Sequence, residues 1–306
     1  MWGVVILNTD FLEKKDVQNR MLKTGIESTA YFGVEDYEQG LKKMKLHGYD
    51  CADYQEVASP SSILFGYSEG AFERYFKELG ACAKETGIEF YQMHGLWPRY
   101  TDKDWNLFDK DIELYQKEFL VAKYIGCKRL VIHPCMPYGW GVELDKGKAF
   151  EQTLEMVETL LPYAKQTDTL ICVENMPFAK GHSFSEIAEI KRLIATVNDE
   201  RVKACFDTGH NNCSQEDIYE CIVTLGEDLE ALHVHDDLRR QDRHLLPFQG
   251  EVDWDKFIKG LQKIGYTGCI SLETHILAKT PEPIREKMQI ALAEIARWFA
   301  LQIEER

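Results

Sequence analysis

The feature that most restricts the fold is a repeated alternation of short β-rich runs with amphipathic helical stretches. Eight runs of strand length follow residue 24, at 26–32, 49–54, 88–93, 129–132, 169–173, 202–206, 229–235 and 268–274. Strands that alternate with helices in this way form parallel sheets. Eight successive βα units close best as an α/β fold of the (β/α)8 TIM-barrel type, whose functional residues lie at the C-terminal ends of the strands.

The apolar segments are spread evenly over the 306 residues, with no polar linker between them. The length would suit two average domains or one large barrel, and the even spread favours the single barrel. Residues 1–22 do not fit the alternation, so we expect an N-terminal extension there and one domain over residues 23–306. Helices are expected at 36–46, 69–86, 104–125, 145–166, from a cap at Ser183 or Ser185 to 195, 254–264 and 283–303.

Composition excludes several classes of protein. Lys plus Arg number 36 and Asp plus Glu number 51, so the formal net charge of -15 would repel a nucleic-acid backbone. The nine cysteines form no C-x-x-C pair and several lie in apolar runs, which is typical of reduced, buried thiols in a cytoplasmic protein. The apolar run 2–7 is too short for an export signal, and no run approaches the roughly 18 residues of a membrane span.

The stretch from residue 232 to residue 274 concentrates side chains that bind metals. His233 and His235 come from one strand-like run, Glu273 comes from the next, and the loop between them contains Asp242 and His244. A lone histidine on a strand is more often a hydrogen-bonded core residue, but this combination of imidazole and carboxylate is a ligand set for a divalent metal. His233 and His235 are two residues apart and point to the same face, so alternation cannot separate their roles.

The same pattern continues around the predicted barrel. Seven polar residues fall at or just beyond the C-terminal end of a strand: His94, His133, Glu174, Asp207, His210, His233 and Glu273. Taken singly, Asp207 would be explained as a helix cap and Glu174 as an ion-pair partner. Their joint placement predicts a metal site at the catalytic face of the barrel.

A thiolate site for zinc is the alternative that the cysteines offer. His133 and Cys135 are close in sequence, and Cys172 and Cys205 each lie two residues before a carboxylate of the predicted site. That spacing places Cys172 and Cys205 deeper in the barrel, where a buried cysteine usually packs as a small hydrophobic residue. The sequence therefore favours carboxylates and imidazoles as the ligands.

The motifs V-E-N, F-D-T-G-H, H-V-H-D and S-L-E-T end the fifth to eighth predicted strands. They resemble those of the xylose-isomerase-like superfamily of metal-dependent barrels, within its sugar isomerase/epimerase group, and the resemblance extends from residue 24 to the C-terminus. The ketose 3-epimerase branch implies one divalent ion (Mn²⁺, Mg²⁺, Co²⁺ or Zn²⁺) held by Glu174, Asp207, His233 and Glu273. It also implies that Glu174 and Glu273 are the catalytic acid/base pair. The role of His235 stays open.

The chain is also similar to the endonuclease IV family of apurinic-site nucleases. In that family nine ligands hold three zinc ions, and the matching residues here are His94, His133, Glu174, Asp207, His210, His233, Asp242, His244 and Glu273. These additional donors, with His235, leave a second or third metal ion open. The acidic balance and the lack of recognisable basic and aromatic DNA-inserting loops favour sugar chemistry over nuclease activity.

We therefore expect a sugar isomerase or epimerase that moves a proton beside a ketose carbonyl through an enediolate. The resemblance implies that His210 and Arg239 bind substrate oxygens, and we expect His94 and Trp97 to contact the sugar as well. The expected partner is a small sugar or sugar-derived molecule, and the lack of an evident Gly-rich phosphate cradle favours an unphosphorylated one. The alternatives are an endonuclease IV-like nuclease and a non-catalytic sugar-binding barrel. The sequence leaves the oligomeric state open between a monomer and a homo-oligomer.

Overall fold

A computed structural model describes residues 22–97, 108–135, 145–179 and 182–305. The predicted N-terminal extension lies outside these ranges except for Leu22, and so does the predicted start of the helix at 104. None of the helices in these ranges combines the length and apolar character that a membrane span requires.

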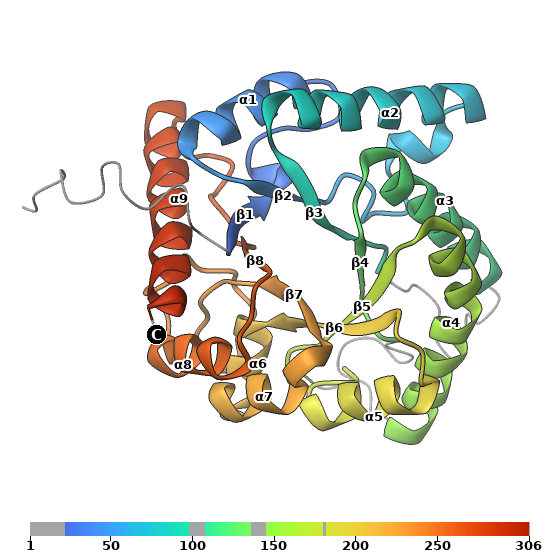
Figure 1. Cartoon of the computed structure of the whole chain (residues 1–306), viewed down its shortest axis with the longest axis vertical. Helices are drawn as coiled ribbons and strands as arrows, with labels where there is room; N and C mark the ends of the chain where they lie inside the picture. Colours follow the sequence, from blue (N-terminus) through green and yellow to red (C-terminus); the bar gives the residue numbers. More distant parts are fainter. Residues whose placement is uncertain (1–21, 98–107, 136–144, 180–181, 306) are drawn as a thin grey trace, which may run out of the picture.

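Parallel strands form a ring at the centre of the molecule (Figure 1). The eight strands are β1 (Lys23–Glu27), β2 (Cys51–Tyr54), β3 (Glu89–His94), β4 (Arg129–Ile132), β5 (Leu170–Glu174), β6 (Val202–Asp207), β7 (Leu229–His233) and β8 (Cys269–Leu272). Each strand pairs with the next in sequence from β1 to β7, and β8 pairs with β1. Between β7 and β8 the ladder is reduced to one isolated bridge, Val234 with Leu272. The fold is therefore a nearly closed (β/α)8 TIM barrel, as predicted.

Helices surround this ring on all sides in Figure 1. They are α1 (Tyr37–His47), α2 (Glu69–Thr86), α3 (Phe108–Ile125), α4 (Lys146–Thr167), α5 (Ile187–Val197), α6 (Thr208–Ser214), α7 (Ile218–Leu225), α8 (Trp254–Ile264) and α9 (Glu282–Glu304). Short 3₁₀ turns occupy Ser28–Ala30, Ile63–Gly66 and Gly226–Asp228. Gly48 and Gly87 end α1 and α2 in the left-handed conformation, at φ 94° and 73°, which glycine adopts without steric cost.

The main core lies between the outer face of the barrel and the helices. In α8, for example, Trp254, Phe257, Ile258 and Leu261 are buried at helical spacing, while the intervening lysines face solvent. Each fully buried side chain of this kind stabilises the fold by about 1.5–3 kcal/mol. The amphipathic pattern that predicted the helices is thus the pattern that fixes them on the barrel.

Small side chains pack inside the barrel, on the N-terminal side of the strand ends. Cys172 and Cys205 pack with Val131 and Ala231, while Cys51 and Cys269 pack beside Tyr91. All nine cysteines are free, and burial raises the pKa of Cys172 well above its usual value. The contacts of Cys172 and Cys205 with apolar side chains support the packing role over the thiolate site.

Three local features differ from the prediction. The first strand was expected at 26–32 but lies at Lys23–Glu27, because Ser28–Ala30 forms a 3₁₀ turn and Phe32 packs on the core from a loop. Neither Ser183 nor Ser185 caps α5; Glu186 does so, in a reciprocal capping box with Glu189. The region after β6 forms the helices α6 and α7, neither of which is among the expected helices, although Asp207 caps α6 as the helix-cap interpretation of that residue suggested.

Candidate metal centre

The ends of four strands bring together the side chains with the strongest capacity to bind a cation. Glu174 ends β5, Asp207 ends β6, His233 ends β7, and Glu273 follows β8 directly. One ligand atom from each residue lies within 4.8 Å of the others, and all four side chains are buried. We call these four residues the strand-end group. They are the four that the ketose 3-epimerase resemblance implied as metal ligands.

Glu174 lies at the middle of a ring of imidazoles. Its Oε1 is 3.1 Å from His233 Nδ1 and 3.3 Å from His210 Nδ1, and its Oε2 is 3.2 Å from His133 Nε2 and 3.7 Å from His94 Nε2. Burial alone would raise its pKa, but the His233 and His133 imidazoles hold the pKa of Glu174 well below its usual range. The side chain is therefore a buried carboxylate, a form that needs positive charge close to it.

Most of the histidines are held by their Nδ1 atoms. Nδ1 lies beside a backbone carbonyl in His94 (Gly95, 2.8 Å), His210 (Asn175, 2.8 Å) and His244 (Glu273, 3.1 Å). A carbonyl oxygen can only accept, so Nδ1 carries the proton in these rings and Nε2 is left to face other groups. This orientation by a second partner is typical of histidines that bind metals.

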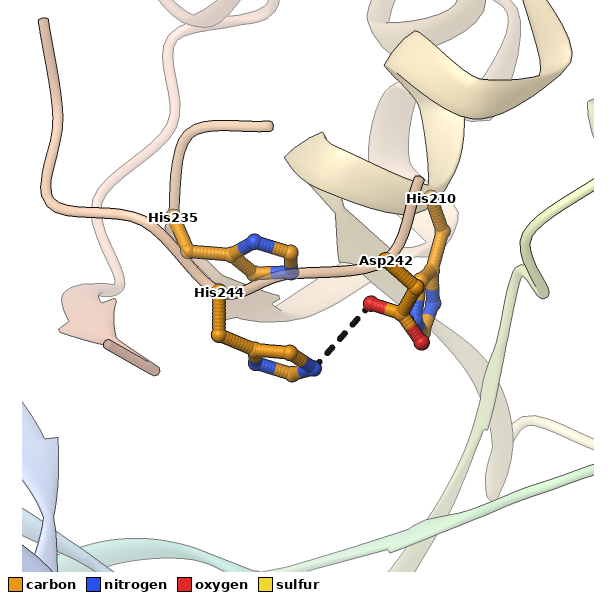
Figure 2. A group of neighbouring side chains, drawn as sticks. All are labelled: His210, His235, Asp242 and His244. Atoms are coloured by element: carbon orange, nitrogen blue, oxygen red, sulfur yellow. Dashed lines mark ion pairs between the residues drawn. The ribbon is translucent and has the colours of Figure 1, made fainter. Parts of the chain in front are cut away.

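A second cluster consists of His210, His235, Asp242 and His244, which we call the His-rich group (Figure 2). Asp242 Oδ1 is 3.2 Å from His244 Nε2 and 3.6 Å from His210 Nε2, and the His235 and His244 rings stack with centroids 4.1 Å apart. Burial would lower the pKa of His244, but Asp242 and Glu273 raise it to about 10. Without a metal, the His-rich group can therefore neutralise itself by protonation.

His235 connects the two groups. Its Nε2 is 3.0 Å from Asp207 Oδ2, and its ring lies directly on Gly209, where an added Cβ would come within 2.0 Å of the ring carbon Cε1. The structure thus separates two histidines that strand alternation could not. His233 faces Glu174 and Glu273, whereas His235 holds Asp207 and stacks on His244.

The sequence analysis missed several polar residues near the site, among them Asp53 and Gln55. Asp53 on β2 accepts from His233 Nε2 at 3.0 Å, and Gln55, just after β2, donates to Glu273 Oε1 at 3.1 Å. Each is a single polar residue in or beside an apolar strand, and neither belongs to a spacing pattern. An aspartate inside the buried run C-A-D-Y was the one available signal.

A cavity of about 90 Å³ opens above the strand-end group. It is lined by His94, Trp97, His133, Glu174, Met176, Pro177, His182, His210, Asp242, His244 and Glu273. Trp97 is 54% exposed and its ring leans over that of His133, with centroids 4.9 Å apart. The cavity therefore combines polar donors at its base with an aromatic side chain at its rim, as sites for small polar ligands commonly do.

Arg239 does not line this cavity. Its side chain is 68% exposed and pairs with Glu251 at 3.6 Å. Both residues line a separate pocket of about 330 Å³ beside the start of α7. A substrate contact by Arg239 would therefore require its side chain to leave Glu251.

The donors of the strand-end group fit a divalent metal. Both carboxylate oxygens of Glu174 and the Nδ1 atom of His233 are buried and have no hydrogen-bond partner among the described residues. Buried polar atoms nearly always have a hydrogen-bond partner. Ligand atoms that lack one and converge within 4.8 Å are suited to binding a cation. Mixed carboxylate and imidazole ligands suit Mn²⁺, Co²⁺ and Zn²⁺, and the carboxylates suit Mg²⁺.

Comparison with known families agrees with this geometry. Residues 41–295 match the family described as xylose isomerase-like TIM barrel. The chain belongs to this family. The strand-end group lies where a TIM barrel places its functional residues.

Three relatives show the range of the family. The protein y4fM of Sinorhizobium fredii is 24% identical over 63% of this chain, and the match spans 58% of y4fM. D-psicose 3-epimerase of Enterocloster bolteae is 22% identical over 81% of this chain and 81% of its own length. A probable endonuclease 4 of Metamycoplasma arthritidis is 26% identical over 73% of this chain and 82% of its own length.

The fold itself is shared with solved structures. D-psicose 3-epimerase with D-tagatose from Clostridium cellulolyticum H10 superposes with a TM-score of 0.76 at 20% identity, over 91% of this chain and 99% of that one. At this level of identity the likeness concerns the fold, because one barrel supports many reactions.

Proposed function

We propose that this protein is a divalent-metal-dependent sugar isomerase or epimerase. The observation that carries the proposal is the convergence of two buried carboxylates on one imidazole nitrogen: His233 Nδ1 lies 3.1 Å from Glu174 Oε1 and 3.4 Å from Glu273 Oε2. The two glutamates come from β5 and β8, three strands apart around the ring. They can therefore approach a small substrate from different directions.

Proton transfer beside a carbonyl needs this arrangement. The metal, when bound, polarises a ketose carbonyl and its neighbouring hydroxyl, and so lowers the pKa of the adjacent C–H. One glutamate removes that proton, which leaves an enediolate. Return of a proton to the opposite face by the other glutamate gives epimerisation, and return to the adjacent carbon gives aldose-ketose isomerisation. His94 and His210 border the same cavity and can hold substrate oxygens.

The base of the cavity keeps both glutamates ionised. For Glu273, burial would raise the pKa, but His233 and His244 lower it to about 2. Both glutamates are thus carboxylates at neutral pH, and either can accept the proton that leaves carbon. The glutamate that returns a proton must first take one up, and His244, whose Nδ1 lies 3.7 Å from Glu273 Oε2 and whose pKa is raised to about 10, is a protonated neighbour that can supply it. Trp97 at the rim offers an apolar face against which a sugar ring can stack.

Relatives of this chain support sugar chemistry. A D-psicose 3-epimerase is among the curated relatives, and solved structures that share the fold include epimerases with D-fructose and D-tagatose. The described residues that line the cavity include no lysine or arginine. We therefore propose an unphosphorylated ketose or a related polyol derivative as the substrate.

Deuterium exchange tests the proposal. The protein, with Mn²⁺ or Mg²⁺, is incubated in D₂O with ketohexoses, ketopentoses and their phosphates, and deuterium beside the carbonyl is measured. Glu174→Gln and Glu273→Gln are expected to abolish exchange, whereas Glu158→Gln, at an exposed position of α4, is the matched control. Absence of metal-dependent exchange across the whole panel would refute the proposal, and sugar binding without exchange would favour the non-catalytic barrel.

A multi-zinc nuclease is the second candidate, because the His-rich group lies beside the strand-end group and shares ligands with the endonuclease IV pattern. Elemental analysis of protein purified without chelator separates the two proposals. One ion per chain supports the epimerase, and three zinc ions with chelator-sensitive cleavage of an abasic-site duplex support the nuclease. We expect one ion and no cleavage.

A further inference from the structure

A polar layer lies inside the barrel beneath the strand-end group. Asp53 Oδ2 accepts a hydrogen bond from His233 Nε2 at 3.0 Å and another from Gln92 Nε2 at 2.9 Å. Gln92 also donates from Nε2 to the backbone oxygen of Leu232 at 3.1 Å. All three side chains are buried. Asp53 is therefore tied to β7 twice, once through the His233 ring and once through Gln92.

These contacts reach across the barrel. Asp53 is on β2 and Gln92 is on β3, whereas His233 ends β7. In the ring, β8 and β1 stand between β7 and β2. The hydrogen bonds consequently link strands that the sheet ladder does not pair.

In the neutral ring, the form that can bind a metal, the acceptor at Asp53 decides which nitrogen of His233 carries the proton. A carboxylate oxygen has lone pairs and no hydrogen to give, so His233 Nε2 must be the donor. The other nitrogen, Nδ1, then points at Glu174 Oε1 and Glu273 Oε2. His94, His210 and His244 have the reverse arrangement, with Nδ1 on a backbone carbonyl.

We propose that Asp53, held by Gln92, is a positioning residue that makes His233 a metal ligand through Nδ1. The inference rests on the metal dependence proposed above, but it does not depend on which substrate is used. Without an acceptor at Asp53, the imidazole can rotate or carry its proton on Nδ1, and in either case the lone pair no longer faces the carboxylates. Such second partners commonly contribute one to two orders of magnitude to metal affinity.

The layer is poorly arranged for a purely stabilising role. Asp53 Oδ1 and Gln92 Oε1 are both buried without a hydrogen-bond partner among the described residues. A buried polar atom left unpaired costs stability, whereas an apolar pair of similar shape would not. The position of Asp53 is therefore better explained by the imidazole that it orients than by the fold that contains it.

Asp53→Leu and Asp53→Asn separate the two roles. Leucine removes the acceptor, so the dissociation constant for Zn²⁺ or Mn²⁺, measured by calorimetry without sugar, should rise by about 10- to 100-fold. Asparagine can keep a carbonyl oxygen at the Oδ2 position, so it should restore affinity to within a few-fold of the parent protein. Gln92→Leu should fall between them. Asp50→Leu, just before β2, is the matched control, since Asp50 accepts hydrogen bonds from Thr24 at the end of the strand away from the site.

Nuclear magnetic resonance of the zinc-loaded protein with ¹⁵N-labelled histidine gives a readout independent of affinity. The His233 ring should show a metal on Nδ1 and a slowly exchanging proton on Nε2, and Asp53→Leu should lose the slow exchange. A metal on Nε2 of His233, or unchanged affinity in Asp53→Leu, would overturn the inference, as would wild-type protein that binds no metal. Weakened metal binding in Asp53→Leu together with no deuterium exchange in the parent would sustain the inference and refute the proposed sugar reaction.

Discussion

The strand-end group and the His-rich group lie side by side but have opposite charge balance. The first has three carboxylates and one imidazole, and the second has three imidazoles and one carboxylate. Three of the four residues in the strand-end group are the last residues of strands, whereas Asp242 and His244 belong to the loop after β7 and are partly exposed. A rigid, carboxylate-rich cluster requires a cation, while a histidine-rich cluster can take up protons instead. We therefore expect the tighter metal site at the strand ends.

The largest expected effect is on metal content. His233→Ala and Asp207→Asn should each weaken binding of the tight ion by more than about 100-fold, because the first removes one of four buried ligands and the second removes the negative charge of another. Asp242→Asn, in the His-rich group, should leave that ion in place. Elemental analysis after dialysis gives the metal content, and circular dichroism confirms that each variant is folded. Equal loss in all three variants would remove the distinction between the two groups.

The link between the groups gives the next prediction. In Gly209→Ala the added Cβ would lie 2.0 Å from a His235 ring atom, so His235 must move away from Asp207. We expect a loss of about 1–3 kcal/mol in the free energy of unfolding in urea. Gly70→Ala is the control, since nothing lies within 4 Å of its Cβ position in α2, and alanine is favoured over glycine in a helix. Equal stability of Gly209→Ala and the parent would show that the His235 ring is not fixed.

Protonation of the His-rich group predicts a dependence of stability on pH. In the metal-free protein the pKa of His244 is raised from 6.5 to about 10. Its charge therefore contributes stability that is fully present below pH 6.5 and is lost as the pH rises through about 10. The difference in unfolding free energy between the parent and His244→Gln should be on the order of 1–2 kcal/mol at pH 6 and should shrink towards pH 10. A difference that stays constant over this range would contradict the assignment.

The smallest effect is expected at the rim. Trp97→Ala should raise KM for the sugar several-fold, equivalent to about 0.5–1.5 kcal/mol, with kcat little changed, because a stacking contact is made with substrate and transition state alike. Phe248→Ala is the comparison, since Phe248 is similarly exposed but packs on Trp254 and Trp298, away from the cavity. A fall in kcat alone would place Trp97 closer to the reacting atoms than its exposure suggests.

The barrel was predictable because alternation is a local property repeated eight times. The meeting of polar side chains at one face was predictable for a related reason, because seven of them fall at strand ends. The choice of Glu174, Asp207, His233 and Glu273 among the seven came from the family resemblance. Strand boundaries were harder to predict from the sequence, as the first strand shows. The apolar residues Tyr31 and Phe32 extend its pattern into a turn that tertiary packing imposes.

Contacts between distant strands could not be predicted. Asp53 meets His233 across 180 residues of sequence, and a single aspartate in an apolar run gives no indication of its partner. The roles of His233 and His235 were likewise indistinguishable by alternation, since both lie on the same face of one strand-like run. Only the end of β7 at His233, and the space left by Gly209, assign the two rings to different neighbours.

The junction between β7 and β8 implies that a bound ion would also stabilise the barrel. There the wall of the barrel is held by the Val234 to Leu272 bridge, with one hydrogen bond from Val234 N to Ser271 O and one from Glu273 N to Val234 O. His233 and Glu273 lie on the two sides of this junction. An ion bound by both would therefore link β7 to β8 where the strands are joined only by an isolated bridge. Amide protons along β7 and β8 should then exchange with solvent more slowly when the ion is bound.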